Sequence, residues 1–349
     1  MTTFSQQINI ADTVIGPEQP VYIIAEAGVN HSGDINLAYK LIDVAVKAGA
    51  NAVKFQLFDT AALIRNDVKK ASYQVQDTTD QQSQYDMLKA LEISPQQCEA
   101  LAEYARSSGI DFIVTPFDEP SLTFLLSLPL SALKISSTDL TNIAFVERAA
   151  QAQVPLILST GMSEQSEVDE AMAMLRGKCN DLILLQCTSS YPAPDAELNL
   201  RVMNKYQSDY DVIVGYSDHT AGIGASPYAV AAGASVIEKH FTLDKSLPGP
   251  DHQASLSPEE LASLVKEIRK VETMMGRSVK RVELCERENR LSLQKCLVAA
   301  EPIAKGEYLT ARNVVARRTG GHGIPAKYIN DVIGKPMHCD LALGDIIDV

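Results

Sequence analysis

Short apolar segments recur at intervals along roughly the first two thirds of this 349-residue chain. Most of the intervals between them, such as 36–46, 95–106 and 163–175, have the apolar spacing of an amphipathic helix. A strand covered by helices on both sides reads as a nearly continuous apolar run, so eight alternations of strand and helix predict a parallel (β/α)8 TIM barrel. The eight predicted strands are 21–25, 52–56, 111–115, 132–136, 155–159, 182–187, 212–215 and 235–240.

The connections between these strands narrow the choice of fold. A doubly wound open sheet also alternates strand and helix, but it usually carries a glycine-rich fingerprint after its first strand. Here the first strand runs into residues 26–31, EAGVNH, which lack that spacing, so the barrel is favoured. The segment 69–84 is polar and rich in Gln and Asp, and we expect it to form an extended loop over the barrel mouth.

The last quarter of the chain has a different pattern. A helical pattern over 258–275 is followed by a charged segment rich in Arg, Lys and Glu, and then by short β-like runs with frequent Gly and Pro and no long helix. We therefore predict a barrel domain over 1–276, a linker over 277–290 and a small β-rich domain over 291–349.

Composition excludes some partners and compartments. Hydrophobic residues make up 46% of the chain, enough for a sizeable core, and the net charge of −13 argues against nucleic acid or an anionic membrane as partner. The six cysteines are scattered, without a Cys-x-x-Cys pair, and are expected to be reduced thiols. No signal peptide or membrane-length apolar run is found, so we expect a soluble cytoplasmic protein.

Polar side chains stand where the predicted strands end. In a parallel barrel the carboxyl ends of all strands converge on one mouth, which is where active sites are built. All eight predicted strands end in such residues although their interiors are apolar. In chain order the polar residues at these ends are Glu26, Lys54, Gln56, Thr115, Lys134, Ser136, Ser137, Ser159, Thr188, Ser189, Ser217, His219, Glu238 and His240.

Two lysines inside apolar strands point to an anionic ligand. Lys54 and Lys134 must lose hydration in such a place, which costs several kcal/mol unless an anion compensates. Hydroxyl groups at neighbouring strand ends, from Ser137, Ser159 and Ser217, would complete a phosphate or carboxylate site.

The same two lysines are also compatible with structures that bind no anion. Each lysine could extend to the surface or pair with an internal carboxylate such as Glu26 or Glu238. A lysine in a barrel also fits a Schiff-base aldolase. A third possibility is that the chain is a binding or regulatory protein built on a disused barrel.

Two histidines at adjacent strand ends indicate metal chemistry instead. His219 and His240 would bind a divalent ion that acts as a Lewis acid, and with imidazole and carboxylate groups but no cysteine spacing the ion could be Mn²⁺, Mg²⁺, Co²⁺ or Zn²⁺. A metal-dependent hydrolase would need more ligands from the early strands, where only His31 is near Glu26.

A series of motifs along the chain resembles the sialic acid synthase family, and the C-terminal residues 305–307 (KGE), 317–318 (RR) and 323–324 (GI) resemble the antifreeze-like (SAF) domain that follows the barrel in that family. The resemblance covers nearly the whole chain, in family order. The barrel motifs are 24–31 (IAEAGVNH), 53–56 (VKFQ), 115–118 (TPFD), 134–137 (KISS), 158–162 (LSTGM), 187–192 (CTSSYP), 217–220 (SDHT), 238–241 (EKHF) and 249–252 (GPDH).

The resemblance implies a role for each matching residue. His219 and His240 match metal ligands, most simply for Mn²⁺, with Mg²⁺ or Co²⁺ as alternatives, and Glu26 lies beside the metal and the reacting carbons. Arg318 matches an arginine that comes from the partner subunit, which implies a domain-swapped homodimer. Phosphoenolpyruvate positions are matched by Lys54, Thr115, Lys134, Ser137, Ser159, Ser189 and Ser217, positions near the acceptor sugar by Gln56, Tyr191 and Asp251, and a further substrate-binding position by Asp139.

The implied reaction condenses phosphoenolpyruvate with an N-acetylated hexose and water, with release of phosphate by C–O cleavage. N-acetylmannosamine, giving N-acetylneuraminate, is the expected acceptor. A 2,4-diacetamido-2,4,6-trideoxy hexose, giving a legionaminic acid, is the alternative, and a pseudaminic-type acceptor is less expected. Three positions depart from the family pattern. Ser189 stands where relatives often have Asn or Thr, and Asp139 stands where several have Glu. Asp77 lies in the loop where an Asn often contacts the sugar.

Overall fold

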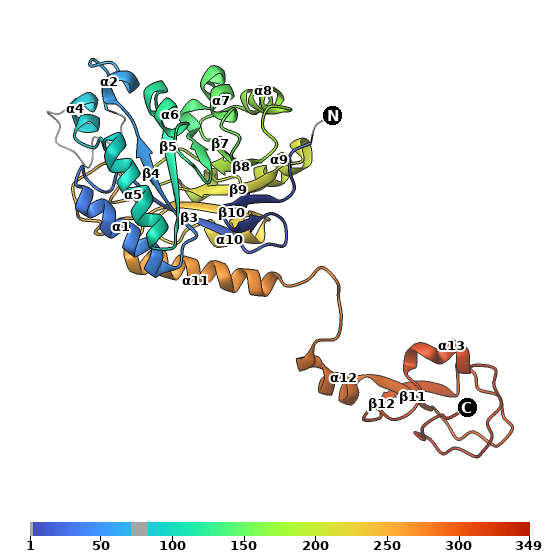
Figure 1. Ribbon diagram of the computed structural model, residues 1–349. Coiled ribbons are helices and arrows are strands. Elements are labelled where there is room, and N and C mark those ends of the chain that lie inside the picture. The colour runs from blue at the N-terminus through green and yellow to red at the C-terminus, as the bar shows by residue number, and fades with distance from the viewer. Residues whose placement is uncertain (1–2, 71–82) are drawn as a thin grey trace. The chain divides into compact units, whose positions relative to one another are not determined.

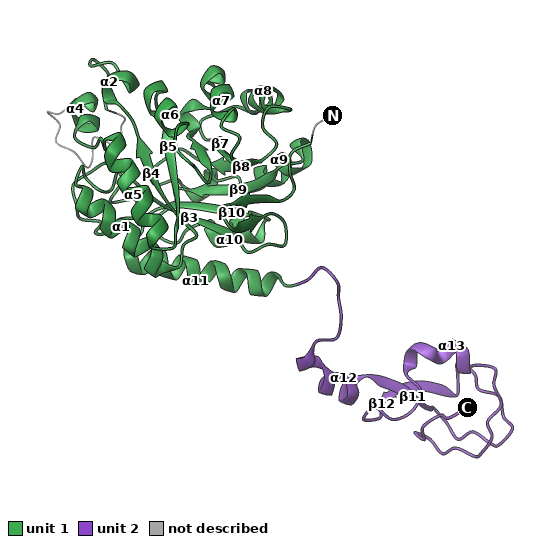
Figure 2. Cartoon of the chain, viewed as in Figure 1, with its two compact units in different colours: residues 1–276 green, residues 277–349 purple. Residues whose placement is uncertain are grey.

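The computed structural model describes residues 3–70 and 83–349. The chain forms two compact units, Met1–Gly276 and Arg277–Val349 (Figure 2), and each is described by itself. Asp77 and most of the segment 69–84, for which an extended loop was expected, lie outside the described residues.

Eight parallel strands form the central sheet of the first unit, in the order β5-β4-β3-β10-β9-β8-β7-β6 (Figure 1). The (β/α)8 prediction is confirmed, and each predicted strand overlaps an observed one. The sheet is nearly closed, with β5 and β6 as its outer strands. The strands are β3 (Tyr22–Gly28), β4 (Ala52–Leu57), β5 (Asp111–Pro116), β6 (Leu133–Ile135), β7 (Leu156–Ser159), β8 (Leu182–Cys187), β9 (Ile213–Asp218) and β10 (Val236–His240).

Helices follow the strands and cover the outside of the sheet (Figure 1). In α1, Ala38, Leu41, Ile42 and Ala45 are buried at helical spacing, which gives the helix one apolar face toward the barrel. The longer helices are α1 (Ile35–Ala48), α5 (Pro95–Ser107), α6 (Glu119–Leu125), α7 (Ile143–Ala150), α8 (Gln165–Leu175), α9 (Val202–Tyr210) and α11 (Pro258–Met275), and the short ones are α2 (Thr60–Leu63), α4 (Gln84–Lys89) and α10 (Ser226–Ala231).

Local sequence signals fix where several helices begin and end. Capping boxes start α5 at Ser94 and α11 at Ser257, in each case with a proline at the first helical positions. Gly49 ends α1 in the left-handed region, at φ 81°. These signals lie in the sequence itself, which is why the helix ranges could be predicted within a few residues.

A short hairpin precedes the barrel and was not predicted. β1 (Ile8–Ile10) pairs antiparallel with β2 (Thr13–Ile15), and their isoleucines pack into one buried cluster with Tyr22 and Ile24 of β3. Tyr22 also donates a hydrogen bond to Asp111 of β5, at 2.6 Å. Since these residues stand at the starts of the barrel strands, the hairpin covers the end of the barrel away from the predicted site.

Strand register brings the predicted site residues side by side. His240 of β10 is opposite Glu26 of β3, and Glu26 is opposite Lys54 of β4. Further around the sheet, Gln56 is opposite Thr115. Because all the strands are parallel, these side chains meet at the carboxyl end of the barrel.

The second unit is small and has its own core. β11 (Lys295–Ala299) pairs antiparallel with β12 (Val314–Arg318), and eight buried apolar residues from these strands and the segments around them form one cluster. The predicted linker 277–290 is not wholly irregular, because it contains a 3-10 turn (Leu284–Glu286) and the start of α12 (Arg287–Leu293). A 3-10 turn (Ala326–Tyr328) and α13 (Ile329–Val332) complete the unit.

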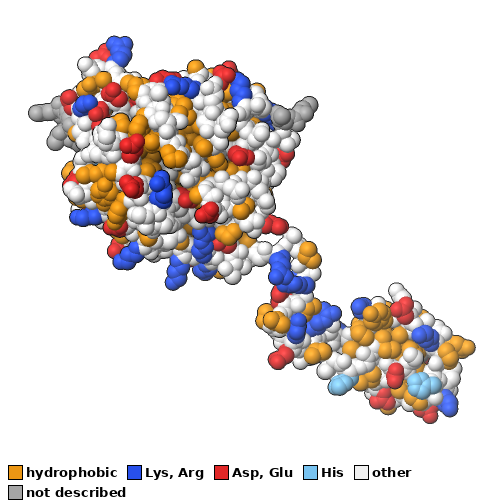
Figure 3. Space-filling view, viewed as in Figure 1, with side chains coloured by type: hydrophobic (Ala, Val, Ile, Leu, Met, Phe, Trp, Pro, Cys, Tyr) orange, Lys and Arg blue, Asp and Glu red, His pale blue; other side chains and the backbone are white. Residues whose placement is uncertain are grey.

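Charge differs between the units. The second unit contains more Lys and Arg than Asp and Glu, although the chain as a whole has a net charge of −13. Figure 3 shows Lys and Arg side chains gathered over α12 and the segment before it. Among the described helices, none is both long enough and apolar enough to cross a membrane.

Candidate active site

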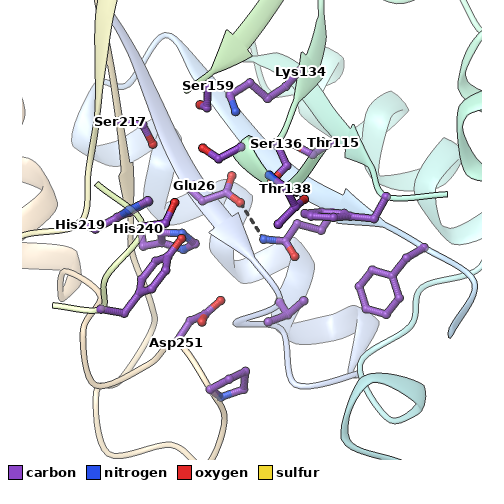
Figure 4. A pocket seen from close by; sticks show the side chains of 18 of the residues that line it. Glu26, Thr115, Lys134, Ser136, Thr138, Ser159, Ser217, His219, His240 and Asp251 are labelled. Atoms are coloured by element: carbon purple, nitrogen blue, oxygen red, sulfur yellow. Dashed lines mark hydrogen bonds between the residues drawn. The ribbon is translucent and has the colours of Figure 1, made fainter. Parts of the chain in front are cut away.

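A cavity of about 430 Å³ opens at the carboxyl ends of the barrel strands (Figure 4). Most of the residues predicted from strand ends and motifs line it together. Those residues are Glu26, Lys54, Gln56, Thr115, Lys134, Ser137, Ser159, Ser189, Tyr191, Ser217, His219, His240 and Asp251.

The two predicted lysines are buried at the inner end of this cavity. Lys54 Nζ lies 2.8 Å from Glu26 Oε2 and donates a hydrogen bond to Thr115 Oγ1 at 3.0 Å. Lys134 Nζ donates to the carbonyl oxygen of Ile135 at 3.0 Å. Figure 4 shows Lys134 and Ser159 at one side of Glu26 and Asp251 at the other.

Glu238 joins the two lysines. Its carboxylate lies 3.8 Å from Lys54 Nζ and 3.7 Å from Lys134 Nζ, and it accepts a hydrogen bond from Ser217 Oγ at 3.0 Å. The pairing of the lysines with internal carboxylates, the alternative to an anion site, is therefore present. The lysines nevertheless line the cavity, so their charges also face a ligand within it.

Burial and pairing set the protonation of these four groups. Burial raises the pKa of Glu26, and the nearby Glu238 adds to this, although Lys54 opposes it. Burial acts against ionised Glu238, but the two lysines outweigh it and lower the pKa of that carboxyl. Burial also lowers the pKa of Lys134, whereas the pKa of Lys54 is raised because two carboxylates outweigh the loss of hydration.

Hydroxyl groups stand close together beside Lys134. The backbone N–H of Gly161 donates to Ser137 Oγ at 2.9 Å, and a β-carbon at position 161 would clash with Ser189 Oγ. Ser159 Oγ is buried and has no hydrogen-bond partner within the part of the chain that the structure describes. A buried hydroxyl without a partner is costly, so Ser159 is placed to bond a ligand in the cavity.

His219 and His240 lie next to each other at one side of the cavity, with ring centroids 5.7 Å apart. His219 Nδ1 lies 2.9 Å from the carbonyl oxygen of Thr188, which orients the ring and leaves Nε2 free for another partner. His240 Nδ1 is buried without a hydrogen-bond partner in residues 3–70 and 83–349. Burial, together with His219 and nearby lysines, lowers the pKa of His240 well below its usual value, which keeps the imidazole neutral.

The donor set fits a metal held by two imidazoles. Within the described residues no group of three or more His, Cys, Asp and Glu side chains is arranged to hold a metal ion. An ion bound by His219 and His240 would therefore take its other ligands from substrate or water, as hard divalent ions commonly do.

The outer part of the predicted site surrounds Glu26. Gln56 Nε2 donates to Glu26 Oε1 at 3.2 Å, and the Tyr191 ring packs against His219 at 4.2 Å between centroids. Gly28, at φ 53°, leaves room here, since a β-carbon would come within 3.3 Å of Gln56, Glu26 and His240. Burial raises the pKa of Asp251 to about 6.

One predicted substrate-binding residue of the first unit is not among the described residues that line this cavity. Asp139 is not part of the lining formed by the described residues, and its carboxylate accepts hydrogen bonds from Thr138 and Asn142. Arg318 ends β12 in the second compact unit, and Asp77 lies outside the described residues.

The cavity also contains residues that the sequence did not assign to the site. Glu238 was visible as a strand-end carboxylate, but only the structure shows it between two lysines. Cys187 Sγ lies 3.7 Å from His219 Nδ1. A set of hydrophobic residues, the apolar wall, lines another part of the cavity: Val29, Phe58, Leu63, Ile64, Met87, Leu88, Leu91 and Phe117.

Known protein families match both compact units of the chain. Residues 41–280 match the NeuB family and residues 294–348 match the SAF domain. N,N'-diacetyllegionaminic acid synthase of Legionella pneumophila is 42% identical, with 94% of each chain covered. The human N-acetylneuraminate-9-phosphate synthase is 35% identical, over 95% of this chain and 93% of its own.

A solved structure shares the same architecture. The crystal structure of N-acetylneuraminic acid (sialic acid) synthetase from Leptospira borgpetersenii, in complex with citrate, superposes with a TM-score of 0.73. It is 37% identical and covers 83% of this chain and 98% of that one. The resemblance to sialic acid synthases and to the antifreeze-like domain is thereby confirmed, and the chain belongs to the NeuB family.

Proposed function

We propose that the protein condenses phosphoenolpyruvate with an N-acetylated hexose and water, forming a nonulosonic acid and phosphate. The observation that carries the proposal is the joint presence, in one cavity, of two buried lysines with serine hydroxyls and of two neighbouring histidines. The lysines and serines suit a small anion that carries phosphate and carboxylate groups, and the two histidines suit a divalent metal that polarises a carbonyl. Its NeuB relatives include a diacetyllegionaminic acid synthase and an N-acetylneuraminate-9-phosphate synthase.

Phosphoenolpyruvate would bind at the inner end of the cavity. Lys54 and Lys134 supply positive charge, and Ser137, Ser159 and Ser217 supply hydroxyl donors for phosphate and carboxylate oxygens. Glu238 holds the lysines in place before the substrate arrives, because its carboxylate contacts both. This arrangement positions the enol carbon without covalent attachment to the protein.

A divalent metal would be held by His219 and His240, Mn²⁺ most simply, with Mg²⁺ or Co²⁺ as alternatives. When bound, such an ion polarises a carbonyl or a water. The protein's own part is orientation: Thr188 fixes the His219 ring, and Tyr191 packs against it.

The reaction forms a C–C bond, adds the oxygen of water to C2 and breaks the bond between C2 and the bridging oxygen. Of the two protons of that water, one ends on the former aldehyde oxygen and the other on the released phosphate. C3 of phosphoenolpyruvate attacks the aldehyde carbon of the open-chain sugar, and water adds to the C2 cation that results. Glu26, whose carboxylate lies beside His240 and Lys54, would take the proton from that water, and phosphate then leaves with the bridging oxygen.

The proposal extends to the identity of the acceptor sugar and to a homodimer. N-acetylmannosamine and a 2,4-diacetamido-2,4,6-trideoxy hexose share the aldehyde and the 2-acetamido group, so the proposed chemistry suits both. We further propose a domain-swapped homodimer in which Arg318 of a partner copy holds the N-acyl end of the sugar. The excess of cationic residues in the second unit supports a role toward anionic or polar ligands.

Phosphate release measured with each substrate omitted in turn tests the proposal. Release should require phosphoenolpyruvate and an N-acetylated hexose together. Incubation with pyruvate and borohydride should leave the protein mass unchanged, because no lysine forms a Schiff base. A stable adduct on Lys54, Lys134 or Lys239 would instead support an aldolase.

A further inference from the structure

The inward-facing positions of two strands change from polar to apolar toward the mouth of the barrel. Lys54 and Gln56 of β4 are followed at the same spacing by Phe58, which comes directly after the strand ends at Leu57. Thr115 of β5 is followed in the same way by Phe117, directly after Pro116. Alternate residues of a strand face the same side, and each residue advances the chain by about 3.3 Å. Phe58 therefore lies roughly 13 Å along the chain beyond Lys54.

The two phenylalanines form the inner part of the apolar wall. Their rings pack edge to face, with centroids 6.4 Å apart and planes at 87°. Val29, Phe58, Met87 and Leu91 are buried in one cluster, and Leu63, Leu88 and Phe117 are partly buried against it. The wall is thus a packed surface rather than a set of isolated side chains.

Helices α2 and α4 supply the outer part of the wall. Leu63 and Ile64 line the cavity from the end of α2, and Met87 and Leu88 line it from α4. Of the described residues that these two helices contribute to the lining, Gln84 is the polar one. Sugar hydroxyl groups facing this surface would find few hydrogen-bond partners among the described side chains that form it, which is unfavourable.

The acceptor must extend toward this wall. Its aldehyde carbon reacts beside Glu26 and His240, and the inner end of the cavity is taken by the phosphoenolpyruvate anion. Carbons 4 to 6 of the open chain then point outward, to the level of Phe58 and Phe117. On the side away from the wall, Tyr191, Pro250 and Asp251 provide polar and ring contacts for the remaining hydroxyls.

We infer that the apolar wall selects an acceptor with apolar groups at its distal end, so that the preferred sugar is the 2,4-diacetamido-2,4,6-trideoxy hexose rather than N-acetylmannosamine. This inference rests on the proposed function. The methyl at C6 and the methyl of the 4-acetamido group would cover the wall, where N-acetylmannosamine presents hydroxyls. One methyl in a hydrophobic pocket changes kcat/KM by roughly 10- to 200-fold.

Three sugars that differ only at the distal end test the inference: N-acetylmannosamine, its 6-deoxy derivative and the 2,4-diacetamido-2,4,6-trideoxy sugar. With saturating phosphoenolpyruvate, kcat/KM should rise in that order, by roughly tenfold or more from first to last. An equal or higher kcat/KM for N-acetylmannosamine would overturn the inference and leave the proposed function standing. No phosphate release with any sugar would refute both.

Wall variants show whether the wall is the source of the selectivity. Leu88→Gln lengthens the side chain by one bond and adds a polar amide, and it should reduce the ratio of kcat/KM between the trideoxy sugar and N-acetylmannosamine several-fold. Leu88→Met is the matched control and should retain the ratio. Ile64→Thr is a second variant should Leu88→Gln fail to fold, and a ratio unchanged in the polar variants would contradict the inference.

Discussion

The inner end of the cavity and the apolar wall are built in different ways. The inner end is a set of buried charges whose members lie within barrel strands, with Lys54 and Lys134 held by Glu26 and Glu238. The wall combines residues just beyond strand ends with two short helices, α2 and α4. Strand register thus fixes the common chemistry, whereas loop and short-helix residues, which can vary without disturbing the barrel, face the part of the substrate that differs between sugars.

Metal removal should have the largest effect, because it affects the chemistry of every acceptor alike. Treatment with EDTA should lower kcat by roughly 10³-fold or more, and Mn²⁺ should restore it. His240→Ala should show the same loss without recovery. Full activity after exhaustive chelation, measured by phosphate release, would show that the two histidines do not act through a metal.

Loss of a lysine from the inner end of the cavity should weaken the use of phosphoenolpyruvate, the substrate proposed to bind there. Lys134→Met removes charged hydrogen bonds to the substrate, each worth about 1.5–3 kcal/mol, so kcat/KM for phosphoenolpyruvate should fall by roughly 10- to 150-fold. It also leaves Glu238 with one cation fewer in a buried site, so the free energy of unfolding should decrease by up to about 3–5 kcal/mol.

Lys239→Met is the matched control for this variant. Lys239 is an equally buried lysine, but it pairs with Asp218 at 3.1 Å and is not among the described residues lining the cavity. It should lose stability while the KM for phosphoenolpyruvate stays unchanged. If both variants changed this KM equally, the assignment of Lys134 to the anion site would be wrong.

Protonation of Asp251, at the mouth of the cavity, should have a smaller effect, seen in the pH dependence of kcat/KM for the sugar. Its pKa is raised to about 6 by burial, so it becomes protonated and loses acceptor capacity as the pH falls through 6. The kcat/KM for the sugar should then drop by up to tenfold per pH unit below 6, and Asp251→Asn should abolish that dependence. A pH profile identical in the variant would remove Asp251 from sugar binding.

Protonation of Asp251 has opposite effects on stability and on activity: as the pH falls, the free energy of unfolding rises while kcat/KM for the sugar drops. The folded protein binds this proton more tightly than the unfolded chain, whose carboxyl has a pKa near 3.9. Protonation of Asp251 therefore stabilises the fold as the pH falls from above 6 toward 4. Thermal unfolding of the wild type and Asp251→Asn across this range separates the two effects.

Much of the barrel and its inner end could be predicted from sequence because both depend on strand positions. Once eight apolar runs are recognised, parallel pairing brings strand-end groups such as Lys54, Lys134, His219 and His240 to one mouth. The hairpin over 8–15 was missed because three-residue strands have too few positions to show a period.

The rest of the site depends on contacts that no local pattern encodes. The apolar wall joins residues from separate loops and helices, and a hydrophobic residue there looks the same as one in the core. Asp139 was predicted to bind substrate, and the structure adds that its carboxylate accepts hydrogen bonds from Thr138 and Asn142 within one short turn. The place of Glu238 between two lysines follows from side-chain geometry rather than from spacing.

Isotope transfer from phosphoenolpyruvate tests the central claim most directly. Phosphoenolpyruvate labelled with ¹⁸O at the bridging position is incubated with the protein, Mn²⁺ and the N-acetylated hexose with the highest kcat/KM, and the products are analysed by mass spectrometry. Cleavage of the C–O bond predicts that the label appears in the released phosphate. Label retained in the sugar acid, or release of phosphate without any sugar acid, would contradict the proposed reaction.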